Sequence, residues 1–290
     1  MFTIKKMLGI APKIESDGSC SPSPLALKLA TKSKTDYDHR VYPNAYKAGK
    51  FRVMMICSEQ RTMAMKNGKY FSTGNHPVEM LVPMLHLEQA GFDIDVYTPT
   101  GESVKIEMWA MPREDDSVKS LYEKHKSNLE NPGSLREFVH NAMDGTSPYI
   151  AVYIPGGHGA MLGLPENRDV ESVLRWAHEQ DKYVLSICHG PAALLAVSLS
   201  GDKNDFLYRG YKMAVFPDSL DKMSPLFGYL PGQLPWFLGE TLQSLGVEIV
   251  NKKANGTCCQ DRKLITGDSP DAANAFGVMA AEALLSAVSE

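Results

Sequence analysis

The chain has 290 residues, of which 43% are hydrophobic and 22% are charged, and its formal net charge at pH 7 is -4. This profile is typical of a globular protein with room for one large α/β domain and an insertion, or for two domains. A negative net charge without a basic stripe argues against stable nucleic-acid binding, because nucleic-acid binders neutralise phosphates with Lys and Arg.

The cysteine count and the hydropathy pattern restrict the cellular location. The five cysteines form no Cys-x-x-Cys pair and no zinc-binding spacing, and their odd number suggests free thiols in a reducing compartment. No stretch approaches the roughly 20 apolar residues that a membrane helix needs. The apolar run at 7–12 is too short for a signal peptide. We therefore expect a cytoplasmic protein without a membrane span.

The first third of the chain predicts a tail followed by the start of an α/β core. Residues 1–47 have weak periodicity and many polar residues, so we expect an N-terminal tail that contributes to a cap. The apolar run at 51–57 predicts a parallel strand covered on both faces. Asn75 as N-cap and Pro77 in the first turn predict a helix, and the residues at 92–98 alternate as a strand.

Residues 100–146 interrupt this pattern. They contain two highly charged helical segments, at about 116–129 and 133–143, and nothing in them continues a parallel sheet. We expect a cap-domain insertion over 100–146. Residues 48–99 and 147–290 would then form the α/β core domain.

A glycine-rich loop follows the next predicted strand, at 149–154. The run Pro-Gly-Gly-His-Gly at 155–159 lets backbone amides approach a ligand closely. It lacks the Lys-Ser/Thr of a phosphate-binding P-loop and the Rossmann spacing, so it is a weak phosphate signal. We interpret it as part of an oxyanion site in which the amides of Gly157 and His189 face one carbonyl oxygen. This requires the two loops to follow adjacent strands.

The strongest motif begins with the apolar strand predicted at 183–187. The strand stops at Cys188, the run His-Gly-Pro at 189–191 turns the chain, and an Ala/Leu-rich helical segment follows. Strand, sharp turn and helix are the layout of a nucleophile elbow. Helix N-terminal amides would favour the thiolate, so we expect an accessible Cys188 thiol of lowered pKa. An isolated Cys-His pair would fit a buried structural cysteine at least as well, but the flanking strand and turn favour a nucleophile.

The candidate partner of His189 is an acidic residue on the same rim. The residues at 210–216 predict a further strand, and Asp218 comes just past its carboxyl end. Asp218 is therefore the candidate to orient His189, although a role in capping the next turn fits the spacing equally well. A helix at 234–245, strands at 247–250 and 262–267, and a terminal helix that begins near Pro270 complete the expected elements.

Together these motifs resemble the ThiJ/PfpI superfamily. Within it the chain is similar to the bacterial heat-inducible chaperone branch, also described as glutathione-independent glyoxalase (glyoxalase III) and protein/nucleotide deglycase. The resemblance covers the chain from Phe51 to the C-terminus. The segments that carry it lie at 71–79, 109–112, 155–159, 188–193, 216–218 and 264–270.

The resemblance implies a fold and a set of site residues. It implies a flavodoxin-like α/β sandwich with a mostly parallel central sheet, a small cap domain and a homodimer. It also implies Cys188 as nucleophile, His189 and Asp218 as the rest of a triad, and Glu79 as a carboxyl group beside the sulfur. Sequence alone places Glu79 in a first helical turn, and a carboxyl group close to a thiolate should be protonated.

The chain departs from the family at one place. Bacterial chaperones of this branch carry a two-histidine, one-carboxylate metal site, and the matching residues in this chain are Glu88, Asp93 and His125. Two acids and one histidine suit harder cations and hold zinc less well. We therefore assign no metal and no other cofactor.

The resemblance favours an enzyme that acts on reactive 2-oxoaldehydes. It would convert methylglyoxal or glyoxal to lactate or glycolate through a Cys188 hemithioacetal, and the same attack would remove early aldehyde adducts from proteins or nucleotides. One alternative is a holdase chaperone that binds unfolded clients on an apolar surface, such as the segment at 109–111. A cysteine peptidase or amidase is another, because any Cys-His-Asp set permits it.

Overall fold

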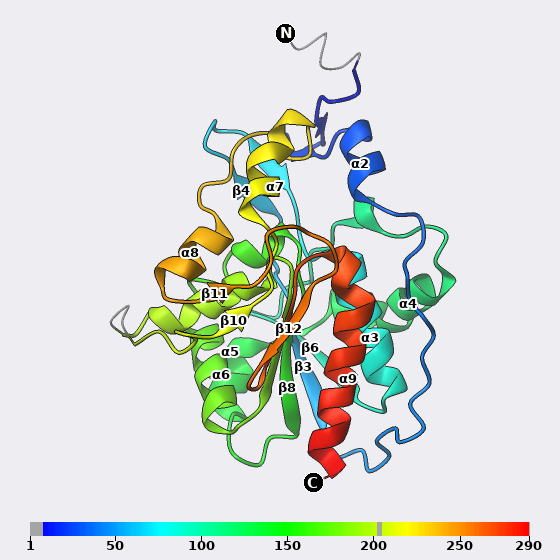
Figure 1. Cartoon of the computed structure of the whole chain (residues 1–290), viewed down its shortest axis with the longest axis vertical. Coiled ribbons are helices and arrows are strands. Elements are labelled where there is room, and N and C mark those ends of the chain that lie inside the picture. The colour runs from blue at the N-terminus through cyan, green and yellow to red at the C-terminus, as the bar shows by residue number, and fades with distance from the viewer. Residues whose placement is uncertain (1–7, 202–204, 290) are drawn as a thin grey trace.

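A seven-stranded sheet forms the centre of the computed structural model, which describes residues 8–201 and 205–289 (Figure 1). The strand order is β12-β13-β9-β8-β3-β6-β7, and every neighbouring pair is parallel except β12 and β13. The predicted α/β fold with a mostly parallel sheet is confirmed. The strands are β3 (Arg52–Ile56), β6 (Asp93–Thr98), β7 (Gly133–Ser134), β8 (Tyr149–Ile154), β9 (Tyr183–Ile187), β12 (Cys258–Asp261) and β13 (Leu264–Gly267).

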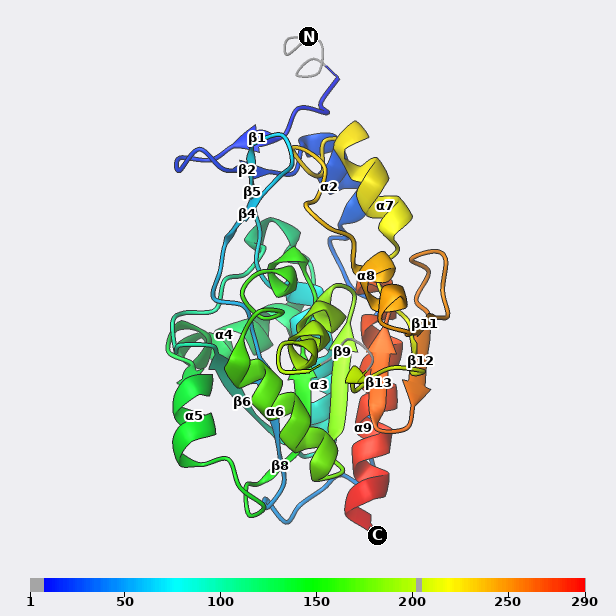
Figure 2. The same ribbon diagram turned by 90° about the vertical axis from the view of Figure 1, so that its left-hand side faces the viewer.

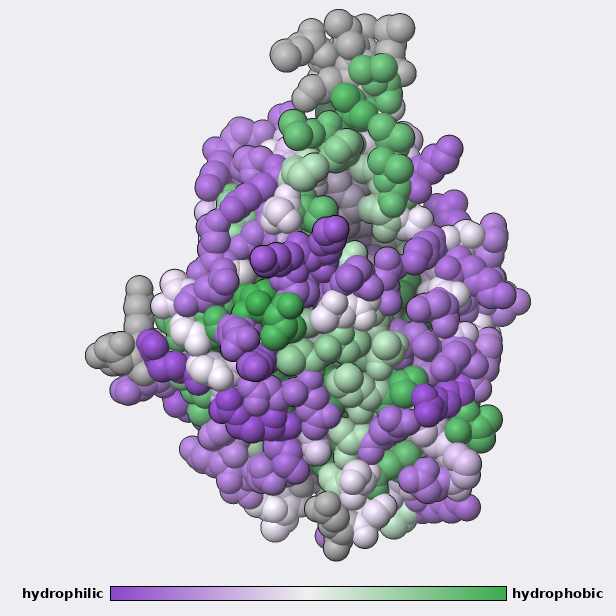
Figure 3. Space-filling model, viewed as in Figure 1, coloured by the Kyte–Doolittle hydropathy of each residue, from purple (hydrophilic) through white to green (hydrophobic). Residues whose placement is uncertain are grey.

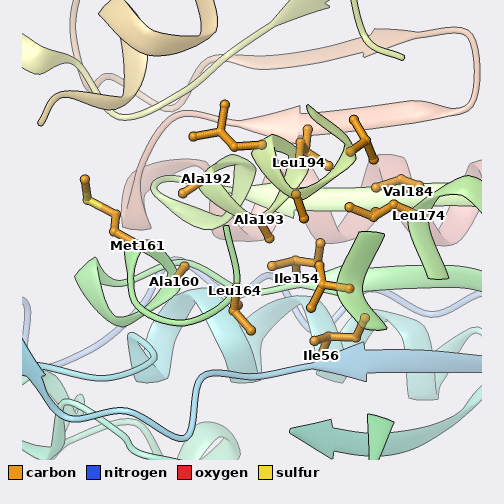
Figure 4. Close-up of a cluster of buried hydrophobic side chains, with 14 of the residues drawn as sticks. Ile56, Ile154, Ala160, Met161, Leu164, Leu174, Val184, Ala192, Ala193 and Leu194 are labelled. Carbon is orange, nitrogen blue, oxygen red and sulfur yellow. The ribbon is translucent and has the colours of Figure 1, made fainter. Parts of the chain in front are cut away.

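Two helical layers cover the sheet (Figures 1 and 2). Successive side chains of a strand point to opposite layers, as β3 illustrates. Met54 and Ile56 of β3 point into one core, whereas Val53 and Met55 point into the other. Figure 4 shows Ile154 and Val184 of the first core packing against the segment at 192–194. The first layer holds α5 (Leu135–Asn141), α6 (Arg168–Glu179) and the 3-10 helix η3 (Gly190–Ser198), and the second holds α3 (Pro77–Gln89), α4 (Asp116–Glu130) and α9 (Ala273–Ser289).

The C-terminal helix corrects one expectation. The segment Pro270–Ser289, which joins the 3-10 helix η6 (Pro270–Ala272) to α9, is long and apolar enough to cross a membrane by length and composition. The same properties suit a core helix, and Phe276, Ala280 and Leu284 are fully buried in the second core. The expectation that no stretch approaches such a length is therefore wrong, and in this fold the helix packs against α3.

The segment at 100–146 is more closely joined to the sheet than expected. β7 pairs in parallel with β6, so the prediction that nothing in this segment continues the sheet is wrong. α4 packs against α3, and α5 packs against α6. The 3-10 helix η1 (Met108–Ala110) lies in the same segment. The division into a core domain and a cap domain stays a prediction.

A second sheet lies at one end of the molecule (Figure 2). Its strands are β1 (Lys13–Ile14), β2 (Cys20–Ser21), β5 (Tyr70–Ser72) and β4 (Thr62–Ala64), in that order. The neighbouring helices at this end are α2 (Pro24–Ala30) and α7 (Asp218–Met223). The strand predicted at 210–216 is shorter and outside the main sheet, because β10 (Lys212–Met213) pairs only with β11 (Glu248–Ile249). Helix α8 (Leu238–Ser244) precedes β11.

The predicted N-terminal tail is fixed to the core where the structure describes it; its first seven residues lie outside the described part. The Tyr42 hydroxyl makes a 3.0 Å hydrogen bond with Nδ1 of His86 in α3. The Tyr46 N–H donates to the Ala90 carbonyl at 2.8 Å, and the Tyr46 ring stacks on Phe92 with 5.4 Å between centroids. Gly91 adopts a φ of 91° directly under this contact.

Gly91→Ala should detach the tail, because a Cβ at this position would overlap the Tyr46 backbone carbonyl. Gly18→Ala is a matched control: its φ is also positive, at 81°, but nothing lies within 4 Å of a Cβ there. Both variants carry the backbone strain, and only Gly91→Ala adds the overlap. We expect it to lower the free energy of unfolding by about 1–3 kcal/mol more than the control, measured by urea denaturation. Equal losses of unfolding free energy in the two variants would contradict the contact between Gly91 and the Tyr46 carbonyl.

Candidate active site

The predicted elbow is present at the carboxyl end of β9. Cys188 has a φ of 61°, which is rare for a residue with a side chain. Its N–H donates to the Gly267 carbonyl at 2.8 Å, and its own carbonyl accepts from the Phe216 N–H at 3.0 Å. Hydrogen bonds on both sides therefore hold the strained backbone in place. The helix that follows is the 3-10 helix η3 rather than an α-helix.

Glycines allow two loops to close around this elbow. β8 pairs with β9, so the loops that follow them lie side by side, as the predicted oxyanion site requires. A Cβ on Gly156 would lie 2.7 Å from the Cβ of Cys188, and a Cβ on Gly157 would lie 2.6 Å from the backbone nitrogen of His76. Gly157 also has a φ of 96°. No side chain fits at either position, so the loop backbone itself forms the wall beside the thiol.

A hydrogen-bonded chain runs from the thiol to a buried carboxylate. The Sγ of Cys188 lies 3.3 Å from Nδ1 of His189, and Nε2 of His189 lies 2.8 Å from Oδ2 of Asp221. Asp221 lies on α7 and is only 1% exposed. Burial would raise the pKa of Asp221, but attraction to His189 and His158 and hydrogen bonds to both rings hold it well below its usual range. The geometry is that of a nucleophile, a base and an orienting acid.

Asp221 takes the place that the sequence assigned to Asp218. The Asp218 carboxylate accepts the N–H groups of Gly239 and Glu240, at 2.8 and 2.7 Å, at the start of α8. The prediction that Asp218 orients His189 is therefore wrong, and its capping alternative is what the structure contains. Asp221 comes three residues later on the same helix. The sequence feature that could have indicated it is the second acidic residue, about one helical turn after Asp218.

A second histidine, which the sequence analysis did not select, belongs to the same group. His158 begins the 3-10 helix η2 (His158–Met161), and its Nε2 lies 2.9 Å from Oδ1 of Asp221. Its ring lies against the ring of His189, with 4.1 Å between centroids. The two oxygens of Asp221 thus serve two stacked imidazoles. The only hint in the sequence was a histidine within the glycine-rich loop.

Glu79 lies beside the nucleophile, as the family resemblance implies. Its carboxyl group contacts the Cys188 thiol and the Gly157 N–H, yet neither oxygen makes a well-directed hydrogen bond. Complete burial raises the pKa of Glu79 well above its ordinary value. The raised pKa favours the neutral, protonated form of Glu79, which can donate its proton toward the sulfur.

The thiol differs from the accessible, low-pKa group that the sequence predicts. Cys188 is only 4% exposed, and burial followed by the Glu79 carboxyl group raises its pKa. No α-helix begins beneath the thiol, because a 3-10 helix follows it, so no helix dipole lowers its pKa. The groups next to the thiol that can exchange a proton with it are the His189 ring and the Glu79 carboxyl group.

A further buried acid lines the site. The Thr73 hydroxyl donates to Oε1 of Glu107 at 2.6 Å, while Oε2 of Glu107 has no hydrogen-bond partner. Burial raises the pKa of Glu107 to about 7. The sequence gave no reason to select Glu107, since it belongs to neither the glycine-rich loop nor the elbow.

These groups form the deep end of a cavity of about 440 Å³. Its deep end is polar, whereas its outer wall comes from apolar side chains of α2 and α7 and from Phe227. A volume in this range accommodates ligands larger than a three-carbon aldehyde. The outer apolar residues include Leu29, Leu220, Met223 and Phe227.

The residues that the family resemblance matches to a metal site do not fit a metal. Glu88 pairs with His125 and with the ammonium group of Lys124, 2.7 Å away. Asp93 is 2.9 Å from Arg52. The acids are therefore already neutralised by cationic side chains. His158, His189 and Asp221 present ligand-type atoms within 4.8 Å of one another, and Asp221 accepts a hydrogen bond from each ring.

Glu79→Gln should change the pH dependence of stability. Because the folded pKa of Glu79 lies above its ordinary value of 4.5, the neutral acid contributes stability that is complete below pH 4.5 and is lost as pH rises toward the folded pKa. Glutamine does not titrate. The stability of the variant relative to wild type should therefore rise by about 1.4 kcal/mol per pH unit in that window.

Urea denaturation at pH 5, 6, 7 and 8 measures this slope. The exposed Glu130→Gln serves as a control for the change in net charge. A difference between Glu79→Gln and wild type that stays constant across the series would mean that Glu79 is already ionised in the fold at pH 5.

Comparisons with known proteins agree with this architecture. Residues 70–283 match the model of the DJ-1/PfpI family. The protein/nucleic acid deglycase HchA of Pseudomonas aeruginosa is 49% identical over 267 residues, which cover 92% of this chain and 91% of the relative. The Staphylococcus aureus protein of the same name is 46% identical over 278 residues, covering 96% and 94% of the two chains.

Solved structures share the fold at lower identity. The crystal structure of glyoxalase III from Candida albicans matches with a TM-score of 0.61 and 19% identity, and the match covers 80% of this chain and 98% of that one. The family predicted from the sequence motifs is confirmed: the chain belongs to the DJ-1/PfpI family.

Proposed function

We propose that the protein is a glutathione-independent glyoxalase that converts methylglyoxal to lactate, and glyoxal to glycolate, without a redox cofactor. The observation that carries this proposal is the thiol of Cys188 between the basic Nδ1 of His189, 3.3 Å away, and the neutral acid Glu79. The relatives named protein/nucleic acid deglycase support a reaction with aldehyde adducts.

The first step is addition of the thiol to the aldehyde. His189 Nδ1 takes the proton of Cys188, and the sulfur forms a bond to the aldehyde carbon. The carbonyl electron pair moves to oxygen, where the backbone N–H groups of Gly157 and His189 stabilise the negative charge. Protonated His189 then returns the proton to this oxygen, which gives a neutral hemithioacetal.

The second step is an internal oxidation and reduction. His189 takes the proton from the former aldehyde carbon, and an enediolate forms between the two carbons. The proton then returns to the neighbouring carbon, and the hydroxyl proton passes from the first oxygen to the second. The first carbon loses two electrons and the second gains two, so no external oxidant is needed. Water cleaves the resulting thioester, which releases the 2-hydroxy acid and restores the thiol.

The same attack extends to glycated substrates. Early aldehyde adducts on protein or nucleotide amines keep an electrophilic carbon, and the cavity of about 440 Å³ provides space for part of the carrier molecule. Deglycation of proteins and nucleotides therefore belongs to the proposal. A cytoplasmic location and a homodimer belong to it as well, and they rest on the sequence and on the family resemblance.

A holdase activity is a second candidate because apolar side chains are exposed around the cavity mouth. Leu29 and Leu226 are 68% and 69% exposed, and Figure 3 shows apolar residues gathered at the end of the molecule that carries α2 and α7. The segment at 109–111 is a poorer candidate surface. Trp109 packs against the rings of Phe71 and Tyr229, and Ala110 is buried.

Cys188→Ala should abolish lactate formation from methylglyoxal in the absence of glutathione. Removal of a nucleophile typically lowers kcat by about 10³-fold or more. Cys259→Ala, at a partly exposed cysteine outside the site, should leave turnover unchanged. Wild-type turnover in Cys188→Ala would contradict the mechanism. Suppression of client aggregation should be equal in the two variants if the holdase activity uses the apolar rim.

Asp221→Asn and Asp218→Asn should separate the two acids of α7. Asp221→Asn leaves His189 without its carboxylate partner, so we expect kcat/KM to fall about 10²- to 10⁴-fold. Asp218→Asn retains an oxygen acceptor for the α8 N–H groups and should keep most of the activity. Steady-state kinetics and thermal unfolding of both variants check this. The reverse order of activities would restore Asp218 as the partner of His189.

A further inference from the structure

Asp221 is shared by two histidines that approach it from neighbouring loops. His158 follows β8 and lies 2.9 Å from Oδ1, while His189 follows β9 and lies 2.8 Å from Oδ2. All three side chains are at least nine-tenths buried. In a triad of nucleophile, base and orienting acid, the acid needs to serve one histidine only. The role of His158 is therefore unexplained by the mechanism above.

The stacking of the two rings limits how much charge the group can hold. Their centroids are 4.1 Å apart and the rings are tilted by 33°. Two imidazolium ions at that separation repel each other strongly, whereas one imidazolium balances the single carboxylate between them. Protonation of both rings is therefore unfavourable, and one imidazolium is the charge that the single carboxylate balances.

The surroundings decide which ring is charged. Burial lowers the pKa of both rings, but Asp221 and Glu107 outweigh it and raise the pKa of His158. Burial lowers the pKa of His189. His189 also differs from His158 in geometry, because its Nδ1 lies 3.3 Å from the Cys188 thiol, which can donate a hydrogen bond only to an unprotonated nitrogen. Burial also holds the pKa of the nearby His76 at about 3, so His76 adds no charge. The other titratable groups facing this pair are Glu79, Cys188 and Tyr229.

We infer that His158 is a positioning residue that carries the positive charge beside Asp221, so that His189 stays neutral and its Nδ1 remains free to accept a proton. Asp221 then orients His189 through Nε2 without making it cationic. Without His158, the carboxylate would stabilise a proton on His189 and remove the base at neutral pH. Only the kinetic part of this inference rests on the proposed glyoxalase function.

Histidine NMR tests the charge assignment independently of turnover. In protein labelled with ¹⁵N-histidine, His158→Gln identifies the His158 signals, and His189→Gln identifies those of His189. At pH 6.5 we expect the His158 ring to be protonated and the His189 ring to be neutral, with the proton of His189 on Nε2. A protonated His189 beside a neutral His158 would overturn the inference, whatever the enzyme assays show.

The pH profile of His158→Gln tests the consequence. Glutamine keeps a neutral N–H donor for Asp221, so the cation is removed while a hydrogen bond is retained. The proton affinity of His189 should then rise, and the acid limb of kcat/KM on methylglyoxal should move up by at least one pH unit. Activity should fall about tenfold or more at pH 6 and approach the wild-type value at pH 8.5.

Two results would overturn this role. A loss by the same factor at every pH would indicate that His158 is merely structural, and an unchanged profile would indicate that it carries no charge. His140→Gln, at a histidine on α5 outside the site, should leave the profile unchanged. If methylglyoxal is not turned over at all, the proposed function fails, and the NMR titration of His189 in His158→Gln still decides the inference by its upward shift.

Discussion

The site depends on the close approach of the loops that follow β8 and β9. At the carboxyl ends of these two strands, the backbone at Gly156 and Gly157 lies against the elbow at Cys188, and a Cβ on Gly190 would lie 2.5 Å from the Ile154 carbonyl. Because no side chains separate the strands there, the wall beside the thiol is backbone. The same approach excludes water from Glu79 and brings His158 against His189. Burial, protonation and stacking in the site therefore all follow from the glycines.

Because water is excluded from the site, its buried groups exchange a small number of protons among themselves. Burial without a cation raises the pKa of Glu79, whereas the two imidazoles that face Asp221 lower its pKa. The Cys188 thiol shares a feature with each of these groups: it is buried, as Glu79 is, and it faces an imidazole, as Asp221 does. Its pKa is raised by burial, so the thiolate forms when His189 accepts the proton. A reaction that forms and breaks C–H and O–H bonds without a redox cofactor needs this kind of closed proton exchange.

The sequence predicted the features that depend on local residue patterns. It did not predict the features that depend on contacts between distant segments. The continuous apolar runs predicted β3, β8 and β9, and the abrupt end of β9 with its turn predicted the elbow. Asp218 and Asp221 could not be distinguished, because the choice depends on where α8 begins, some twenty residues later. His158 becomes part of the site through Asp221 of α7 and through the ring of His189, which follows the neighbouring strand. The predicted cap segment also differed, since only tertiary pairing reveals that two residues at 133–134 extend the sheet.

The contrast between the two ends of the cavity connects the proposed activities. The deep end is lined by Cys188, His189, Glu79 and the backbone at Gly157, so the proposed chemistry at the electrophilic carbon takes place there. The outer end is wide and apolar, with Leu220 and Met223 partly exposed, so it selects little beyond apolar character. A free 2-oxoaldehyde uses only the deep end, whereas an adduct on a larger carrier also contacts the rim. The proposed chemistry thus depends on the deep end, and the apolar outer end provides contact area for a larger carrier.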